Sequence, residues 1–327
     1  MYDIPLIDLQ PQFDNLVAEA EIAKKIGDAC KNSGFFAVRG HGIPGKIIEH
    51  CWQVSHDFFS LAEAEKLKIQ MPFAGYPYGF AAMEAETLSL SRGEHAPPDL
   101  KENFSAGPNA TPPAGISADE ALFVFSENQW PQEPANFKQA WETCYEAMSL
   151  LSMRLMRLFA LALNLPQNYF DEFLRQPISA FRANHYPALN KAALPGQLRA
   201  GTHSDYGSLT LLLQEEGLSG LEILNRQKKW IPVTPCMPEV IVNLGDLMER
   251  WTNGRWLSTL HRVNIPESKT AQNQSRMSLA FFQQPDWDAR IECLPTCLDP
   301  DGTAKYPVLT SGRHLMERFH STVLNET

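Results

Sequence analysis

The sequence has no long apolar run, no cysteine pair with CxxC spacing and no excess of basic residues. A transmembrane helix needs about 20 consecutive apolar residues, and a secretory leader needs a shorter apolar stretch near the N-terminus. Neither pattern is present, so we expect a cytoplasmic protein that does not enter membranes. The six cysteines lack the spacing of a zinc or redox motif and are expected to be reduced thiols: Cys30, Cys51, Cys144, Cys236, Cys293 and Cys297.

The net charge of the chain indicates which kinds of partner to expect. The chain has 28 Lys and Arg against 38 Asp and Glu, which gives a formal net charge of −10 at pH 7. Proteins that bind nucleic acid or anionic membranes carry basic patches. We therefore expect a small-molecule substrate and neither a nucleic-acid nor a membrane partner. The sequence does not indicate an oligomeric state.

The N-terminal part of the chain has helical periodicity. Apolar residues recur at helical spacing between Leu16 and Ser33 and again from about Ala135 to Leu163. We predict a helical and loop region over 1–134, then a long helix whose apolar stripe packs on the rest of the protein. No linker divides the 327 residues, so a single domain over 1–327 is expected.

From Ile178 to Leu294 the apolar residues follow the period of strands. Gly, Pro and Asn separate short runs of β-forming residues there. This pattern predicts a double-stranded β-helix, or jelly roll, as the core over 178–294. With the helices that flank it, the expected fold class is α+β.

A proline-rich stretch lies between these regions. Seven prolines occur from Ala96 to Pro134, too many for a continuous helix or a central strand. The stretch is either a lid or a surface loop. We favour a lid over 96–134, because long loops of compact domains are often functional.

The chemistry-bearing motif is His203-Ser204-Asp205, followed much later by His261. His203 ends one strand-like run and His261 lies in another, and residues i and i+2 of a strand point to the same face. Two imidazoles and a carboxylate are the facial triad of non-heme Fe(II) oxygenases. We predict a metal site at His203, Asp205 and His261.

Arg276 and Ser278 are also two residues apart and open a strand-like run that reaches Phe282. A planar guanidinium beside a hydroxyl suits a carboxylate. Phe282 shares the strand face of Arg276 and is either an aromatic substrate wall or barrel packing. Arg182 is expected to face inward, to anchor a polar substrate or to pair with an internal carboxylate.

At these residues the chain resembles the isopenicillin N synthase-like family of Fe(II)/2-oxoglutarate-dependent oxygenases, whose pattern is His-x-Asp, a distal His and Arg-x-Ser. Further matching stretches are Ile4 to Asp8, Gly34 to Ile43, Asn184 to Pro187, Val242 to Asp246 and Ser311 to Arg318. Within the family the chain is similar to a subgroup that includes fungal thymine 7-hydroxylase, on the stretches Ala96 to Glu102, Pro195 to Ser208 and Asp246 to Trp251.

The resemblance implies catalytic roles and co-substrates. His203, Asp205 and His261 would bind Fe(II). Arg276 and Ser278 would bind the far carboxylate of 2-oxoglutarate with help from Tyr186, and Asn184 would lie near its chelating end. His185 replaces a Tyr of many relatives and should point away from the site.

The implied reaction is oxidation of a C–H bond, most often hydroxylation, with O2 as oxidant and with succinate and CO2 as co-products. Arg182, Tyr206 and Phe282 match positions around the substrate in the subgroup. Tyr206 could instead support the loop that carries the metal ligands. Ser179 replaces an Asn of thymine 7-hydroxylase, so the substrate stays open.

Two alternatives remain at this point. Some relatives keep the triad and Arg-x-Ser but use no 2-oxoglutarate. A protein of another class, either a non-catalytic metal-binding barrel or a zinc hydrolase, could use the same three ligands. Succinate release coupled to O2 uptake distinguishes them.

Overall fold

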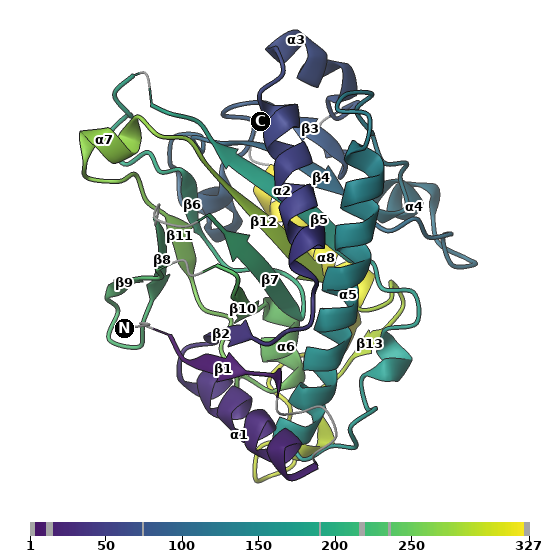
Figure 1. Cartoon of the computed structure of the whole chain (residues 1–327). Coiled ribbons are helices and arrows are strands. Elements are labelled where there is room, and N and C mark those ends of the chain that lie inside the picture. Colours follow the sequence, from purple (N-terminus) through teal and green to yellow (C-terminus); the bar gives the residue numbers. More distant parts are fainter. Residues whose placement is uncertain are drawn as a thin grey trace.

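The computed structural model describes residues 4–10, 16–73, 75–189, 191–215, 220–234 and 237–323, and Cys236 lies outside them. Two β-sheets face each other, and long helices cover the outer face of the larger one (Figure 1). This is the expected α+β architecture with a jelly-roll core.

The larger sheet has eight strands in the order β1-β2-β10-β7-β12-β5-β4-β3. Its strands are antiparallel to their neighbours except that β1 runs parallel to β2. The bounds are β1 (Leu6–Asp8), β2 (Phe35–Arg39), β3 (Gly79–Ala81), β4 (Glu102–Ala106), β5 (Ala180–Tyr186), β7 (Leu209–Gln214), β10 (Val240–Leu244) and β12 (Arg276–Gln283).

The smaller sheet has the order β6-β11-β8-β9, and a separate hairpin pairs β13 with β14. The bounds are β6 (Ala200–His203), β8 (Leu221–Leu224), β9 (Trp230–Pro232), β11 (His261–Val263), β13 (Arg290–Ile291) and β14 (Leu309–Thr310). Residues of both sheets line one cavity, which therefore lies between them.

Side-chain alternation separates the two faces of the larger sheet. In β12 the cavity face carries Arg276, Ser278, Ala280 and Phe282, whereas Met277, Leu279 and Phe281 are buried in the main hydrophobic core. Successive residues of a strand point to opposite faces, so one strand serves the site and the core at once.

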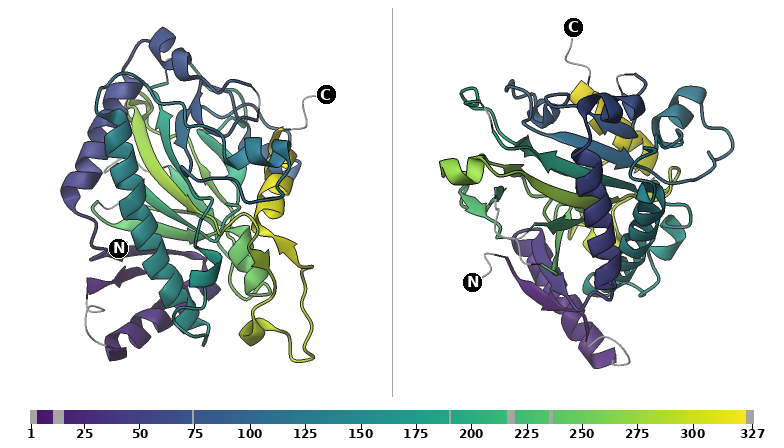
Figure 2. Two further views of the ribbon diagram at one scale, coloured as in Figure 1. Left: turned by 90° about the vertical axis from the view of Figure 1, so that its right-hand side faces the viewer. Right: turned by 45° about the horizontal axis from the view of Figure 1, so that its top comes forward.

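The core forms between the larger sheet and the helices. α5 (Phe137–Ala162) packs against β12, α1 (Leu16–Asn32) and α2 (Gly45–Phe59). Figure 2 shows the long helices on one side of the sheet and α8 (Ser311–Val323) on the other. The short helices are α3 (Glu63–Lys66), α4 (Ala118–Val124), α6 (Asp246–Trp251) and α7 (Lys269–Gln272). The two helices expected from periodicity are confirmed as α1 and α5.

The N-terminal region differs from the expected helix and loop, because it contributes β1 to β4 to the larger sheet. β4 lies inside the proline-rich stretch, between β3 and β5, so the expectation of no central strand there is wrong. Its prolines flank the strand and none lies within it. The polar residues of β4 are stabilised by distant partners: Glu102 pairs with Lys66 at 2.7 Å, and Ser105 accepts a hydrogen bond from Arg182 at 2.8 Å.

No helix in the described part of the chain is long and apolar enough to cross a membrane.

Candidate active site

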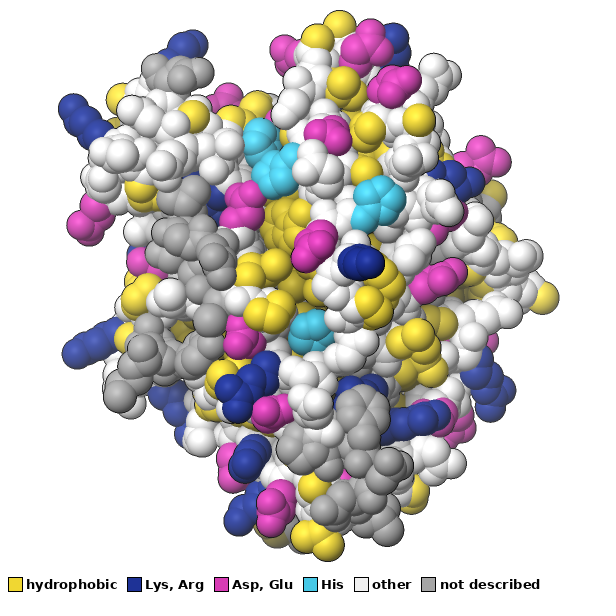
Figure 3. All heavy atoms as spheres, in the orientation of Figure 1, with side chains coloured by type: hydrophobic (Ala, Val, Ile, Leu, Met, Phe, Trp, Pro, Cys, Tyr) yellow, Lys and Arg dark blue, Asp and Glu magenta, His cyan; other side chains and the backbone are white. Residues whose placement is uncertain are grey.

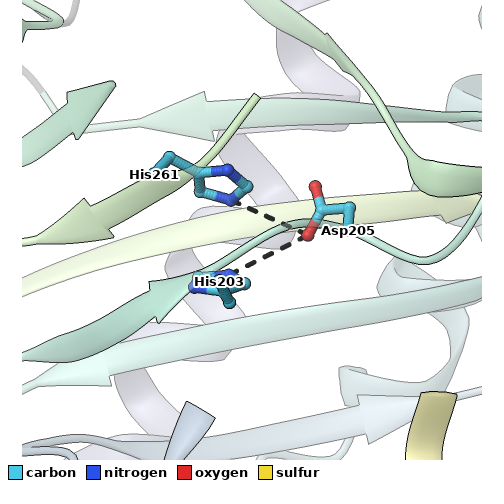
Figure 4. Close-up of side chains that lie close together, drawn as sticks. All are labelled: His203, Asp205 and His261. Atoms are coloured by element: carbon cyan, nitrogen blue, oxygen red, sulfur yellow. Dashed lines mark ion pairs between the residues drawn. The ribbon is translucent and has the colours of Figure 1, made fainter. Parts of the chain in front are cut away.

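His203 and His261 are direct cross-strand partners, because β6 and β11 pair antiparallel with these two residues in register. Asp205 follows β6 in the chain. Its Oδ1 lies 3.9 Å from Nε2 of His203 and 3.7 Å from Nε2 of His261 (Figure 4). The three potential ligand atoms lie within 4.8 Å of one another. The structure therefore brings together the three residues that the sequence predicts for the metal site.

Hydrogen bonds orient each of the three side chains. Nδ1 of His203 lies 2.7 Å from the carbonyl oxygen of Gly201, and Nδ1 of His261 lies 3.0 Å from that of Thr259. A carbonyl can only accept, so Nδ1 carries the proton and each Nε2 keeps a lone pair with which it can bind a metal. This arrangement is typical of metal-binding histidines.

The carboxylate of Asp205 is held through its other oxygen. Oδ2 accepts hydrogen bonds from the Thr210 hydroxyl at 2.6 Å and from the Asn243 amide at 2.7 Å. Oδ1 is left to face the two imidazoles. Thr210 and Asn243 thus fix the direction in which the carboxylate can bind a cation.

The protonation states suit a metal. Burial, and next the neighbouring His261, lower the pKa of His203 to about 3. Burial opposes ionisation of Asp205, but the two histidines and the bonds from Asn243 and Thr210 lower its pKa overall. At neutral pH, His203 is therefore a neutral imidazole beside a carboxylate. Two imidazoles and one carboxylate fit Fe(II).

Sequence reasoning missed the residues that hold the ligands in place. Asn243 gives a recognisable signal, because it is the one polar residue in the fully buried strand Val240–Leu244 and so needs a partner. Asp99 gives none. This buried loop residue accepts the backbone N–H of Gly201 at 2.9 Å, and the carbonyl of Gly201 accepts from His203.

The predicted co-substrate residues form two adjacent cross-strand pairs between β12 and β5. Arg276 lies opposite Tyr186, and Ser278 lies opposite Asn184. The Arg276 guanidinium lies over the Tyr186 ring, 4.9 Å from its centroid. Arg276 is 1% exposed, and no described residue hydrogen-bonds to its Nε or Nη1. A buried guanidinium with two nitrogens that lack a described acceptor suits a bound carboxylate.

His185 points away from the cavity, as expected. Its Nδ1 lies 2.8 Å from Glu102, and its ring stacks on Phe59. The side chain of His185 therefore does not line the cavity.

Arg182 faces the cavity but is not free there. Its Nη1 bonds to both carboxylate oxygens of Glu86 at 3.1 and 3.2 Å, and Lys101 contacts the same carboxylate at 2.6 Å. Burial opposes ionisation of Glu86, yet Arg182 and Lys101 lower its pKa to about 2. Glu86 is thus the internal carboxylate that the sequence could not identify, since it lies in a loop with no periodicity.

Tyr206 has contacts on both sides. It lines the cavity, and the guanidinium of Arg318 lies 4.9 Å from the centre of its ring. Arg318 also pairs with Asp246 at 2.9 Å, and the backbone N–H of Asp246 donates to the carbonyl of Asp205 at 2.8 Å. Tyr206 therefore lies between the cavity and Arg318 of α8.

All ten predicted site residues line a single cavity of about 230 Å³. They are His203, Asp205, His261, Arg276, Ser278, Tyr186, Asn184, Phe282, Arg182 and Tyr206. The metal donors, the buried guanidinium and the aromatic wall therefore share one space.

Two family models match the chain. The N-terminal model of non-haem dioxygenases in morphine synthesis covers residues 4–133. The 2OG-Fe(II) oxygenase superfamily model covers residues 177–285, which include the metal triad and Arg276.

The sequences of curated relatives match this chain over nearly its full length. Homoarginine-6-hydroxylase from Oryza sativa subsp. japonica is 32% identical and covers 96% of each chain. Validamycin A dioxygenase from Streptomyces hygroscopicus subsp. limoneus is 29% identical, over 96% of this chain and 85% of its own.

A crystal structure of full-length thymine 7-hydroxylase from Neurospora crassa in complex with alpha-KG, or 2-oxoglutarate, shares the fold. It has a TM-score of 0.85 and 30% identity, and the match covers 97% of this chain and 96% of that chain. These similarities favour neither the 2-oxoglutarate-independent oxidases nor a non-catalytic barrel. The chain belongs to the Fe(II)/2-oxoglutarate-dependent oxygenases and is a non-heme dioxygenase that uses Fe(II), 2-oxoglutarate and O2.

Proposed function

We propose that the protein hydroxylates a C–H bond of a small molecule at the metal site formed by His203, Asp205 and His261, with succinate and CO2 as co-products. The observation that carries this proposal is the shared cavity, where three oriented metal donors and the buried Arg276 face the same space. Arg276 and Ser278, with Tyr186, would hold the far carboxylate of 2-oxoglutarate. Asn184 would lie beside its chelating end.

The residues of the chain prepare the site for this reaction. Fe(II) with 2-oxoglutarate and O2 supplies an oxidant that can attack an unactivated C–H bond. Asn243 and Thr210 hold Asp205 in its binding orientation, and the backbone carbonyls of Gly201 and Thr259 hold the imidazoles. Such prior orientation reduces the reorganisation that binding and reaction require.

The substrate side of the cavity combines an apolar wall with one charged cluster. Phe282 contributes an aromatic surface, and Arg182, Glu86 and Lys101 form the cluster. We propose a substrate with an apolar or flat body and a polar group that bonds to Arg182. The relatives named above act on homoarginine or validamycin A, and one structure of the Neurospora crassa enzyme contains thymine, which supports a small molecule as the class.

The surface of the protein also fits a small-molecule substrate. On the face in Figure 3, acidic and basic side chains are interspersed, and hydrophobic side chains gather around a central hollow. The net charge of −10 also fits a small-molecule substrate.

We further propose that the helical part of the proline-rich stretch is the lid of the cavity. Phe123 and Val124 at the end of α4 line the cavity from one side, and Leu315 and Phe319 of α8 line it from another. The rings of Phe123 and Phe319 meet edge to face with centroids 4.9 Å apart. β4 is part of the sheet and would not move with α4.

The proposal is tested by reconstituting the protein with Fe(II) and following O2 uptake, succinate release and product mass across a panel of amino-acid derivatives, nucleobases and cyclitols. We expect succinate to form in step with O2 uptake and one substrate to gain a single oxygen atom. Succinate formation with products that lose two hydrogens or a methyl group would contradict hydroxylation while leaving the dioxygenase assignment intact.

Arg182→Met should impair use of the primary substrate. Loss of a hydrogen bond to a charged group lowers kcat/KM about ten- to hundredfold, and we expect that range for the primary substrate, with 2-oxoglutarate affinity unchanged. The check is steady-state kinetics in both substrates, with Arg157→Met on the exposed face of α5 as control. An equal loss in the affinities for both substrates would assign Arg182 a structural role instead.

A further inference from the structure

A second buried guanidinium lies beside the segment that leads into β12, although sequence reasoning did not single it out. Arg199 directly precedes β6 and is 0% exposed. Its Nη2 donates to the carbonyl of Gln274 at 3.3 Å, and no described residue hydrogen-bonds to its Nε or Nη1. Arg199 is absent from the cavity wall, so it would not touch the co-substrate.

Arg199 lies close to Arg276, because its Nη2 donates to the carbonyl of Gln274, two residues before Arg276. Burial, and next the charge of Arg276, lower the pKa of Arg199 to about 10. Burial also lowers the pKa of Arg276. Arg199 remains protonated at neutral pH, so two positive charges are buried near each other. A buried charge without a partner destabilises a fold.

The described acid that interacts with Arg276 is already engaged. Glu215 interacts electrostatically with Arg276, but one of its oxygens contacts Nε2 of His56 at 2.7 Å and the other accepts the backbone N–H of Met277 at 2.6 Å. Among the described residues, Glu215 interacts with Arg276 and no carboxylate hydrogen-bonds to Arg199, so the two guanidinium groups carry an excess of positive charge. That excess would be offset by an anionic group bound at Arg276.

We propose that Arg199 is a positioning residue for 2-oxoglutarate: its charge reinforces that of Arg276, makes the pocket select 2-oxo acids with an anionic far end, and destabilises the ligand-free fold. The inference rests on the binding of 2-oxoglutarate by this site. A purely structural role is the opposing explanation, in which the bond to Gln274 simply anchors the segment before β12.

The two explanations differ in ligand selectivity. 2-Oxobutyrate has the same chelating end as 2-oxoglutarate but lacks the far carboxylate, so it reports on chelation alone. The test measures dissociation constants for both acids with Fe(II)-loaded protein under anaerobic conditions, by the visible charge-transfer absorption of the chelate. It compares the native protein with Arg199→Met, which removes the charge, and Arg199→Lys, which keeps it. Thermal unfolding of each ligand-free protein is the second readout.

For Arg199→Met we expect the 2-oxoglutarate dissociation constant to rise about tenfold, that of 2-oxobutyrate to change less than about twofold, and the unfolding temperature to stay level or rise. Arg199→Lys should retain most of the selectivity. Arg157→Met, which removes the same charge from the exposed face of α5, should leave the ratio of the two constants unchanged.

An unchanged ratio in Arg199→Met, whether or not its unfolding temperature falls, would overturn the proposal and favour the structural role. The titration of the native protein tests the co-substrate assignment separately. If the native protein showed no absorption band with 2-oxoglutarate, that assignment itself would fail.

Discussion

Asp205→Ala should lose Fe(II) binding and, with it, all 2-oxoglutarate-dependent O2 uptake. Asp205 is the one carboxylate of the triad, and its Oδ1 faces both Nε2 atoms. Removing the partner of a metal ligand typically weakens metal binding 10- to 100-fold. Removal of the ligand itself should weaken Fe(II) binding further, so we expect the Fe(II) affinity to fall by more than about a hundredfold. Equilibrium dialysis of Fe(II) measures it directly.

A graded comparison makes this prediction sharper. Asn243→Ala removes a hydrogen bond to Asp205 but keeps the carboxylate, so its Fe(II) affinity should lie between those of the native protein and Asp205→Ala. Asp171→Ala removes a half-buried carboxylate outside the cavity that pairs with Arg157 and should bind Fe(II) normally. Stoichiometric Fe(II) and full turnover in Asp205→Ala would contradict the assignment of the triad.

Arg276→Lys should raise the KM for 2-oxoglutarate strongly and leave Fe(II) binding intact. The guanidinium lies over the ring of Tyr186 and is buried, and lysine replaces its planar fork with a point charge on a differently shaped stem. Loss of paired hydrogen bonds to a carboxylate should weaken 2-oxoglutarate binding by at least about tenfold. The charge-transfer titration gives the affinity without depending on turnover.

This variant separates the two halves of the site. Metal affinity should match that of the native protein, because the triad is on β6 and β11 and the loop after β6, whereas Arg276 opens β12. Arg290→Lys alters an exposed arginine that pairs with Glu292 and serves as the matched control. If Arg276→Lys kept native dependence on 2-oxoglutarate, Arg276 would not be the residue that binds the far carboxylate.

Local periodicity explains why so much of the site could be predicted. Arg276, Ser278 and Phe282 share a face of β12, and Arg182, Asn184 and Tyr186 lie on the same face of the sheet in the neighbouring β5. That alternation depends only on the geometry of an extended chain. The same reasoning correctly placed His185 on the opposite face.

The prediction for the proline-rich stretch shows the limit of such reasoning. Its composition argued against a central strand, yet Glu102 to Ala106 is a buried strand. Lys66 and His185 pair with its Glu102, and Arg182 bonds to its Ser105, from distant parts of the chain. Local propensity is a weak guide where tertiary partners stabilise the strand.

The sequence by itself determined the reaction class, the ten residues that share the cavity, the two long helices and the jelly-roll core, because these depend on residue chemistry and on short-range periodicity. Only the tertiary structure decided which polar side chains meet. Glu86 pairs with Arg182 across a separation of 96 residues, and Asn243 reaches Asp205 across 38. The proximity of Arg199 to Arg276 is likewise a product of folding, because strand pairing joins residues whose separation along the chain carries no periodic signal.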